Sequence, residues 1–193
     1  MAEYTFQQRD FEHPSILFKL EDMLKNLIGG SLIYYPYFNT FCLKGNEKVL
    51  DFGCGGGAGS KCLATLLNKE GRLTCVDLSP YWTGKAKKRL REFANAEVKC
   101  GDIGALDLPE DYFDVVTVMR VIHDISPDKR QDIMTTLSRK LKKGGKFFIR
   151  ERIGKSHGMP VSEIQALSEK AGLKEIEHKE TGSDYIGKFF KVD

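Results

Sequence analysis

Two hydrophobic patterns divide the chain near residue 45. In the first 44 residues, apolar side chains recur at helical spacing: Ile16, Leu17, Leu20, Met23, Leu24, Leu27 and Ile28. This spacing predicts a helix with one apolar stripe, which needs another surface to cover it. From Gly45 onward, short apolar runs alternate with helical patterns, as in βαβ units. The pattern therefore predicts an N-terminal helical and aromatic segment, 1–44, followed by an α/β domain, 45–193.

The α/β pattern predicts a doubly wound sheet whose strands are mostly parallel. Apolar and β-branched runs place five strands, at 48–52, 72–77, 97–100, 114–121 and 146–151. Intervening patterns predict helices at 59–68, 80–94, 126–142 and 161–171. Two further strands, 173–180 and 185–192, flank Thr181-Gly182-Ser183-Asp184, which is typical of a hairpin turn. The expected sheet has seven strands and ends in an antiparallel pair, unlike an all-parallel nucleotide-binding sheet.

Three interpretations of the N-terminal segment remain open. Gly29-Gly30 interrupts its helix, and an aromatic cluster follows, formed by Tyr34, Tyr35, Tyr37, Phe38 and Phe41. In the first, the apolar stripe packs on the sheet and the aromatic rings fill the space between the segment and the α/β domain. In the second, the segment forms a lid over a substrate cleft. A helix on a membrane surface over 14–41 is the third interpretation, which the few basic residues of the segment disfavour.

Composition predicts an ordinary globular protein. The chain has 193 residues, of which 41% are hydrophobic and 30% charged, and that length suits one domain. No apolar run approaches the roughly 20 residues that span a bilayer. The N-terminus, Met1-Ala2-Glu3-Tyr4-Thr5, lacks the basic and apolar regions of a signal peptide. We expect a cytoplasmic protein.

Charge and cysteine content narrow the expected partners. The net charge is +3, with basic residues interleaved with acidic ones. The densest basic run, 85–91, contains no aromatic residue for base stacking, so no nucleic-acid partner is expected. The five cysteines form no CxxC pair, so the sequence predicts reduced thiols, with neither a disulfide framework nor a metal site.

A carboxylate beside a glycine-rich turn is the most informative local feature. Asp51 lies two positions before Gly53 in Asp51-Phe52-Gly53-Cys54-Gly55-Gly56-Gly57. In dinucleotide-binding turns, the glycines and the next helix approach a pyrophosphate, which a carboxylate would repel. A ligand that carries an ammonium and a sulfonium group suits Asp51 better, because opposite charges attract strongly in a partly desolvated cleft.

Four further motifs follow in order, each near the end of a predicted strand. They are Cys75-Val76-Asp77-Leu78-Ser79-Pro80, Gly101-Asp102-Ile103, the run from Asp114 to Val121, and the run from Leu141 to Ile149. Together with the glycine-rich turn, they make the chain from about Lys48 to its end resemble the class I S-adenosylmethionine-dependent methyltransferases. The resemblance implies a Rossmann-like fold, S-adenosylmethionine as cofactor and methyl transfer to a small-molecule acceptor.

The resemblance also assigns roles to individual residues. Asp51 would hold the ammonium group of the cofactor, and the backbone at Gly53, Cys54 and Gly55 would approach its methionine part. Asp77 would accept hydrogen bonds from the ribose hydroxyls. The adenine would lie beside Leu78, with Asp102 accepting from its amine and Ile103 packing on the ring. Arg120 and Val121 would form the ligand-facing end of the fourth strand.

Two other functional classes stay open. Gly53, Gly55 and Ala58 also fit the G-x-G-x-x-A fingerprint of NAD(P)- or FAD-dependent oxidoreductases. Asp51, Asp102 and the terminal hairpin argue against that class. A protein that binds S-adenosylmethionine without catalysis is the other class, because every assigned residue concerns the cofactor.

No catalytic residue is assigned from the sequence. Methyl transfer from a sulfonium depends mainly on alignment, which contributes about 7 to 11 kcal/mol. If the acceptor arrives protonated, His123 and His157 are the candidate general bases, because they follow the fourth and fifth predicted strands. Each histidine could instead bond a backbone carbonyl and fix its loop.

Overall fold

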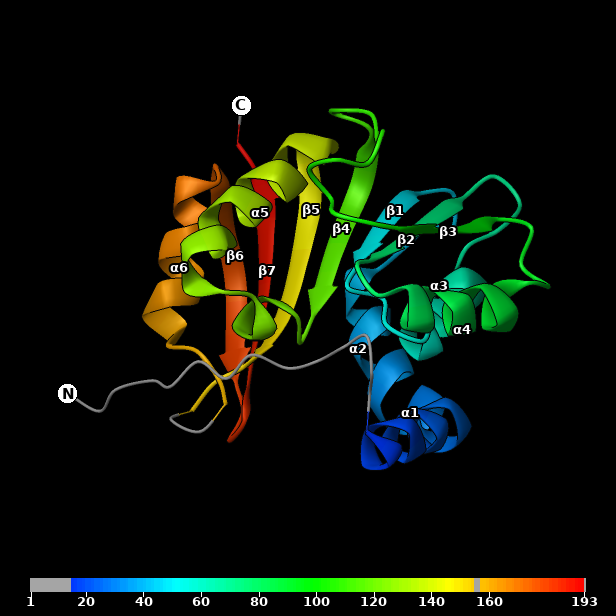
Figure 1. The fold of residues 1–193 in the computed structure, drawn as a ribbon. Helices are drawn as coiled ribbons and strands as arrows, with labels where there is room; N and C mark the ends of the chain where they lie inside the picture. The colour runs from blue at the N-terminus through cyan, green and yellow to red at the C-terminus, as the bar shows by residue number, and fades with distance from the viewer. Residues whose placement is uncertain (1–14, 155–156, 193) are drawn as a thin grey trace. The chain divides into compact units, whose positions relative to one another are not determined.

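The computed structural model describes residues 15–154 and 157–192 (Figure 1). The chain divides into two compact units, one within residues 10–102 and one within residues 103–193. Within the described ranges, no helix is both long enough and apolar enough to cross a membrane.

The first unit is built on three parallel strands in the order β3-β2-β1. They are β1 (Lys48–Phe52), β2 (Arg72–Asp77) and β3 (Ala96–Cys100). The connections are α3 (Ala58–Leu66) and α4 (Pro80–Leu90), which pack beside each other (Figure 1). Proline opens α4, and the hydroxyl of Ser79 accepts a hydrogen bond from the backbone N–H of Trp82. Both predicted crossovers are therefore present in this unit.

The N-terminal segment is helical, as predicted, but differs in detail. It consists of α1 (Ile16–Gly29), a π-helical turn (Gly30–Tyr34), α2 (Tyr35–Phe38) and a 3-10 turn (Asn39–Phe41). The aromatic side chains that close it, Tyr37, Phe38 and Phe41, are buried and in mutual ring contact. The α-helix ends at Gly29, as predicted, but the chain continues from Gly30 as a π-helical turn.

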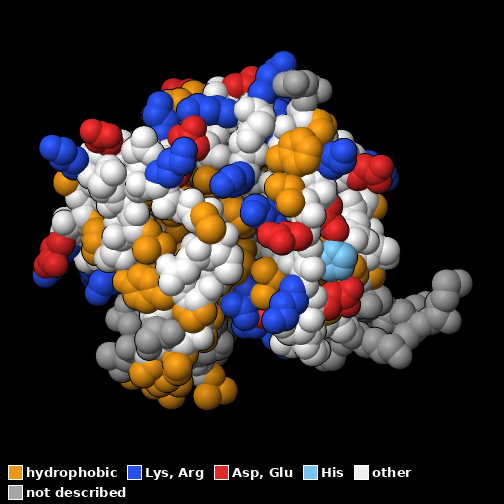
Figure 2. All heavy atoms as spheres, turned by 180° about the vertical axis from the view of Figure 1, so that it is seen from behind, with side chains coloured by type: hydrophobic (Ala, Val, Ile, Leu, Met, Phe, Trp, Pro, Cys, Tyr) orange, Lys and Arg blue, Asp and Glu red, His pale blue; other side chains and the backbone are white. Residues whose placement is uncertain are grey.

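The prediction that the apolar stripe packs on the sheet is wrong. Six of its side chains are exposed: Ile16, Leu17, Leu20, Met23, Leu24 and Ile28. Hydrophobic side chains gather over α1 in the space-filling view (Figure 2). Among the described side chains of α1, Asp22 is buried and forms ion pairs with Arg89 and Lys85 of α4.

The second unit is a four-stranded mixed sheet in the order β4-β5-β7-β6. Its strands are β4 (Phe113–Met119), β5 (Leu141–Arg152), β6 (Leu173–Glu180) and β7 (Asp184–Lys191). β4 and β5 are parallel, whereas β7 is antiparallel to both β5 and β6. α5 (Pro127–Lys140) and α6 (Val161–Lys170) pack beside each other against this sheet (Figure 1). The predicted antiparallel ending is confirmed.

Several element ends in this unit differ from the sequence-based expectation, and the strand predicted at 146–151 already begins at Leu141 as β5. The predicted helix 126–142 ends at Lys140, because buried Leu141 already has extended backbone and pairs with Phe113. The fourth strand ends at Met119, because Arg120 has a φ of 58° and turns the chain out of the sheet. A 3-10 turn, η3 (Ile122–Asp124), follows.

Candidate functional site

The glycine-rich turn between β1 and α3 is tied to the neighbouring strand. The backbone N–H groups of Gly53 and Cys54 both donate to the carbonyl of Val76, at 2.8 and 3.1 Å. Gly55 has a φ of 52°, and a Cβ built there would meet nothing within 4 Å. Gly57 has a φ of 79°, but its Cβ would lie 3.0 Å from Ala86 of α4. Gly57 thus serves helix packing, whereas Gly55 leaves its backbone open to a ligand.

Asp51 lies at the base of this turn and is 6% exposed. Its Oδ2 accepts a hydrogen bond of 2.6 Å from the hydroxyl of Ser60, a fully buried residue of α3. Burial is the largest influence on the pKa of Asp51 and raises it. The hydrogen bond from Ser60 lowers this pKa, the charge of Asp77 raises it, and the net value is about 6. A nearby ligand cation would offset this unfavourable burial of negative charge. The sequence gives no indication of Ser60, because its role depends on how α3 packs.

Asp77 connects the end of β2 to the glycine-rich turn. Its Oδ2 accepts from the backbone N–H of Gly55 at 2.8 Å, and its Oδ1 accepts from that of Ser79 at 2.9 Å. Burial raises the pKa of Asp77, although these two hydrogen bonds lower it. Each carboxylate oxygen can accept a further hydrogen bond, so Asp77 can still bind a pair of hydroxyl groups.

Cys54 is not a reactive thiol in this turn. Its hydrogen bond with Cys75 and its burial raise its pKa well above the usual range. A thiol held in the protonated form is a poor nucleophile. Cys54 therefore contributes its backbone and its packing.

The residues predicted to contact an adenine differ in exposure. Leu78, just after β2, is 69% exposed, which is unusual for a large apolar side chain. Asp102, after β3, is also exposed. Ile103 is only 3% exposed, and it belongs to the second unit.

The N-terminal segment is linked to the glycine-rich turn through Arg89 of α4 and lies against the start of α3. Arg89 donates to the carboxylate of Asp22 from two nitrogens, at 2.8 and 2.7 Å, and to the carbonyl of Gly56 at 2.6 Å. A Cβ built at Gly59 would lie 3.2 Å from the ring of Tyr34. Burial, followed by the charges of Asp22 and Asp51, raises the pKa of Tyr34 to about 12. The segment therefore forms part of the surroundings of Asp51.

In the second unit, the side chain of Arg120 is held by the sheet. Its Nη2 donates to both oxygens of Asp184 on β7, at 2.9 and 2.8 Å. Asp184 is 1% exposed and also accepts from Nε of Arg150 at 2.8 Å. The backbone N–H of Arg120 donates to the carbonyl of Arg150 at 2.6 Å, so the sheet holds this residue through both its side chain and its backbone.

A buried glutamate organises the turn that contains His123. Oε1 of Glu151 accepts from the backbone N–H groups of Val121 and Ile122, both at 2.8 Å. Its Oε2 lies 2.6 Å from Nδ1 of His123. The sequence suggested that each candidate histidine acts as a base or bonds a backbone carbonyl, but His123 bonds the fully buried carboxylate of Glu151.

The structure also brings the two candidate histidines together. The rings of His123 and His157 lie edge to face, with centroids 5.1 Å apart. Asp124, which the sequence does not single out, lies beside both rings. The sequence could not predict this grouping, because His157 lies in a different loop.

Comparison with known proteins decides the family. The methyltransferase domain profile matches residues 49–145, half of the chain. The chain belongs to the methyltransferase domain family. The match contains all residues predicted to contact the cofactor and His123, and it ends before Glu151 and His157.

The chain is also similar to curated proteins. It is 25% identical over 143 residues to an uncharacterized methyltransferase of Synechocystis sp., covering 74% of this chain and 65% of that protein. It is 34% identical over 112 residues to the mitochondrial ubiquinone biosynthesis O-methyltransferase of Schizosaccharomyces pombe, covering 56% of this chain and 38% of that protein. The chain thus spans less than two thirds of these relatives.

Solved structures share the fold of this chain. A TehB-like SAM-dependent methyltransferase from Corynebacterium glutamicum has a TM-score of 0.73 at 22% identity, covering 90% of this chain and 96% of that one. A SAM-dependent methyltransferase from Aquifex aeolicus has a TM-score of 0.72 at 19% identity, covering 90% and 97%. These similarities confirm the predicted Rossmann-like α/β fold.

Proposed function

We propose that this protein binds S-adenosylmethionine at the glycine-rich turn and transfers the methyl group to a small-molecule acceptor. One observation supports this most strongly: a buried carboxylate, Asp51, lies at the base of a turn whose Gly55 faces open space. This combination suits a ligand that brings a positive charge close to the backbone. Membership of the methyltransferase family agrees with it.

The zwitterionic end of the cofactor fits the groups around this turn. Its ammonium group would be held by Asp51, whose burial makes a neighbouring cation favourable. Its carboxylate would be held at the start of α3, where no side chain caps the first turn and the backbone N–H groups favour an anion.

The nucleoside end would be held by residues after β2 and β3. Asp77 is fixed by Gly55 and Ser79 and retains acceptor capacity for ribose hydroxyls. Exposed Leu78 offers an apolar surface to the adenine, and Asp102 an acceptor for its amine. We retain Ile103, Arg120 and Val121 as proposed contacts on the strength of the sequence resemblance.

The same observations disfavour a dinucleotide. A pyrophosphate placed at Gly55 would lie near the carboxylates of Asp51 and Asp77, and the charge of Asp77 already raises the pKa of Asp51. That repulsion has no counterpart in a dinucleotide site, where the glycines and the helix N-terminus receive the phosphates. NAD(P)- or FAD-dependent oxidation is therefore the weaker assignment.

Catalysis would rest mainly on positioning. When bound, S-adenosylmethionine supplies a methyl group on a sulfonium, which needs little further activation. The turn and the two strand ends would orient the cofactor, and alignment alone contributes about 7 to 11 kcal/mol. The proposed acceptor atom is an oxygen, because several relatives with 34% to 36% identity are named O-methyltransferases.

The test combines binding with turnover. Isothermal titration of the full chain should show binding of S-adenosylhomocysteine and no binding of NAD. Asp77→Asn should weaken the binding of S-adenosylhomocysteine without unfolding the protein. A panel of phenols, alcohols, amines and thiols should identify the acceptor by the release of S-adenosylhomocysteine. Binding of NAD alone would overturn the cofactor assignment, whereas cofactor binding without any turnover would favour the non-catalytic alternative.

We also propose that the N-terminal segment acts as a lid on the cofactor turn. The ion pair of Asp22 with Arg89, which in turn bonds Gly56, supports this proposal, as does the contact of Tyr34 with Gly59. Hydrogen exchange measures it directly: protection of residues 15–41 should rise when S-adenosylhomocysteine binds. Equal protection in both states would contradict the lid.

A further inference from the structure

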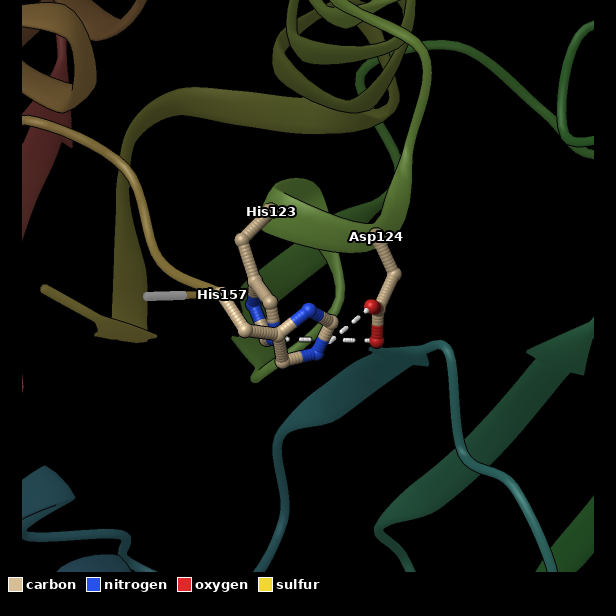
Figure 3. Close-up of side chains that lie close together, drawn as sticks. All are labelled: His123, Asp124 and His157. Carbon is tan, nitrogen blue, oxygen red and sulfur yellow. Dashed lines mark ion pairs between the residues drawn. The ribbon is translucent and has the colours of Figure 1, made fainter. Parts of the chain in front are cut away.

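Three side chains of metal-ligand type converge in the second unit. His123 and Asp124 belong to η3, which follows β4, and His157 belongs to the loop that follows β5. β4 and β5 are adjacent and parallel, with Met119 paired with Arg150, so both loops leave the same edge of the sheet. In the close-up, both imidazole rings point toward the Asp124 carboxylate (Figure 3). Open α/β sheets bind their ligands at this edge.

The distances between these side chains suit a shared ion. Nε2 of His157 lies 3.2 Å from Oδ1 of Asp124, and Nε2 of His123 lies 3.5 Å from Oδ2 of Asp124. One ligand atom from each residue lies within 4.8 Å of the other two. Ligand atoms about 2.0 to 2.1 Å from a tetrahedral zinc ion lie about 3.3 Å apart. Only small side-chain movements would therefore bring all three around one ion.

Glu151 prepares His123 for metal binding. Its Oε2 lies 2.6 Å from Nδ1 of His123, and its other oxygen is held by the N–H groups of Val121 and Ile122. A carboxylate that accepts from one ring nitrogen places the proton there and leaves the other nitrogen as a metal ligand. In this structure, that other nitrogen faces Asp124.

The backbone and the local charge are also compatible with an ion. His157 has a φ of 56°, a left-handed conformation that is uncommon for a residue other than glycine and is often found at functional sites. Asp124 and Glu151 supply two negative charges, which balance a divalent cation. The guanidinium of Arg130 bonds the carbonyl of His123 at 3.1 Å, and Glu163 neutralises it at 2.6 Å.

We propose that His123, Asp124 and His157 bind one divalent transition-metal ion of the zinc type. Two imidazoles and a carboxylate select such ions over magnesium and calcium, which prefer sites built from oxygen ligands alone. Three protein ligands leave at least one coordination position for a small oxygen ligand, as in catalytic rather than structural zinc sites. The proposal goes beyond methyl transfer and does not depend on it.

To test this proposal, the full chain is first treated with a chelator to remove metal. It is then titrated with Zn²⁺, followed by calorimetry, and with Co²⁺, followed by visible absorption. One equivalent should bind, with the spectrum of nitrogen and oxygen ligands. His157→Ala and Asp124→Asn, which alter partly exposed side chains, should each weaken binding at least about tenfold. Glu151→Gln should weaken it about 10- to 100-fold through the orientation of His123.

His178 provides the matched control. It lies on β6, and its Nδ1 is 2.6 Å from a carboxylate oxygen of Glu175, but it is no part of the cluster. His178→Ala should bind Zn²⁺ like the wild type. The proposal is overturned if the wild-type chain binds no ion, if His157→Ala and Asp124→Asn bind it equally well, or if the Co²⁺ spectrum shows thiolate ligation. The three side chains would then form only an ion-paired clamp between two loops.

Discussion

The hydroxyl of Ser60 donates a hydrogen bond of 2.6 Å to the carboxylate of Asp51, and both residues are buried. This bond is the main support that the protein itself gives to a charge at the base of the glycine-rich turn. It lowers the pKa of Asp51, but burial dominates and raises that pKa to about 6. The turn is therefore under electrostatic strain until a cation is near.

Asp51→Asn should stabilise the protein at neutral pH while weakening cofactor binding. The pKa of Asp51 rises from 3.8 to about 6 on folding, so its ionised form costs roughly 3 kcal/mol above pH 6. The gain should vanish below about pH 4, where Asp51 is protonated in both states. Thermal unfolding of the wild type and of Asp51→Asn at pH 4 and pH 7.5 measures the difference in stability between them at each pH. A loss of stability at pH 7.5 would contradict the argument.

Cofactor binding should release protons near pH 6. At that pH about half of the Asp51 side chains are protonated, and a ligand ammonium favours the carboxylate. Calorimetry of S-adenosylhomocysteine binding in two buffers of different ionisation enthalpy measures the release, which should disappear at pH 8. Methylthioadenosine, which lacks the ammonium group, is the matched control ligand. Equal proton release with both ligands would exclude Asp51 as the ammonium partner.

Gly55→Ala should reduce cofactor affinity much more than it reduces the free energy of unfolding. At a φ of 52°, alanine costs about 1 to 2 kcal/mol, yet its Cβ meets no atom within 4 Å. We expect modest destabilisation and a large loss of cofactor affinity, because the Cβ occupies the space left for the ligand. Chemical denaturation and calorimetry measure the two effects.

Two other glycines serve as controls for Gly55. Gly144 has a φ of 68° and open space around its Cβ, so Gly144→Ala should destabilise equally and leave binding unchanged. Gly57→Ala should destabilise more, by about 2 to 4 kcal/mol, because its Cβ would lie 3.0 Å from Ala86. Equal affinity in Gly55→Ala and the wild type would place the ligand elsewhere.

Asp184→Asn should destabilise the second unit by about 3 to 5 kcal/mol. The substitution leaves Arg120 and Arg150 beside a buried neutral amide, which does not replace a carboxylate. Burial raises the pKa of Asp184, but Arg120 and Arg150 outweigh it and the net pKa is lowered. The stabilisation is therefore present above pH 4 and lost in stronger acid.

Urea unfolding at several pH values measures this loss, with Asp114→Asn as the control. Asp114 pairs with Lys142 on the surface, where 34% and 41% of the two side chains are exposed. An exposed pair of this kind contributes at most about 1 kcal/mol. A similar loss of unfolding free energy in both variants would show that the burial of Asp184 does not account for the stabilisation.

The sequence by itself determined the order and kind of the elements from residue 45 onward. β1, β2 and β6 have the predicted bounds. In β1 and β2, short apolar runs flanked by turn residues set these bounds, whereas β6 is polar and is delimited by Gly172 and by the turn after Glu180. The same local signals placed Asp51 and Asp77 at strand ends, and the hairpin between β6 and β7.

Only the tertiary structure decided which polar groups meet. Ser60 reaches Asp51, Asp184 holds Arg120, and Glu151 orients His123, although 9, 64 and 28 residues separate the partners. Hydrophobic periodicity reports which face of an element is apolar, but it does not identify the surface that covers that face. The exposed stripe of α1 and the grouping of His123 with Asp124 and His157 therefore depend on long-range packing, which no local pattern encodes.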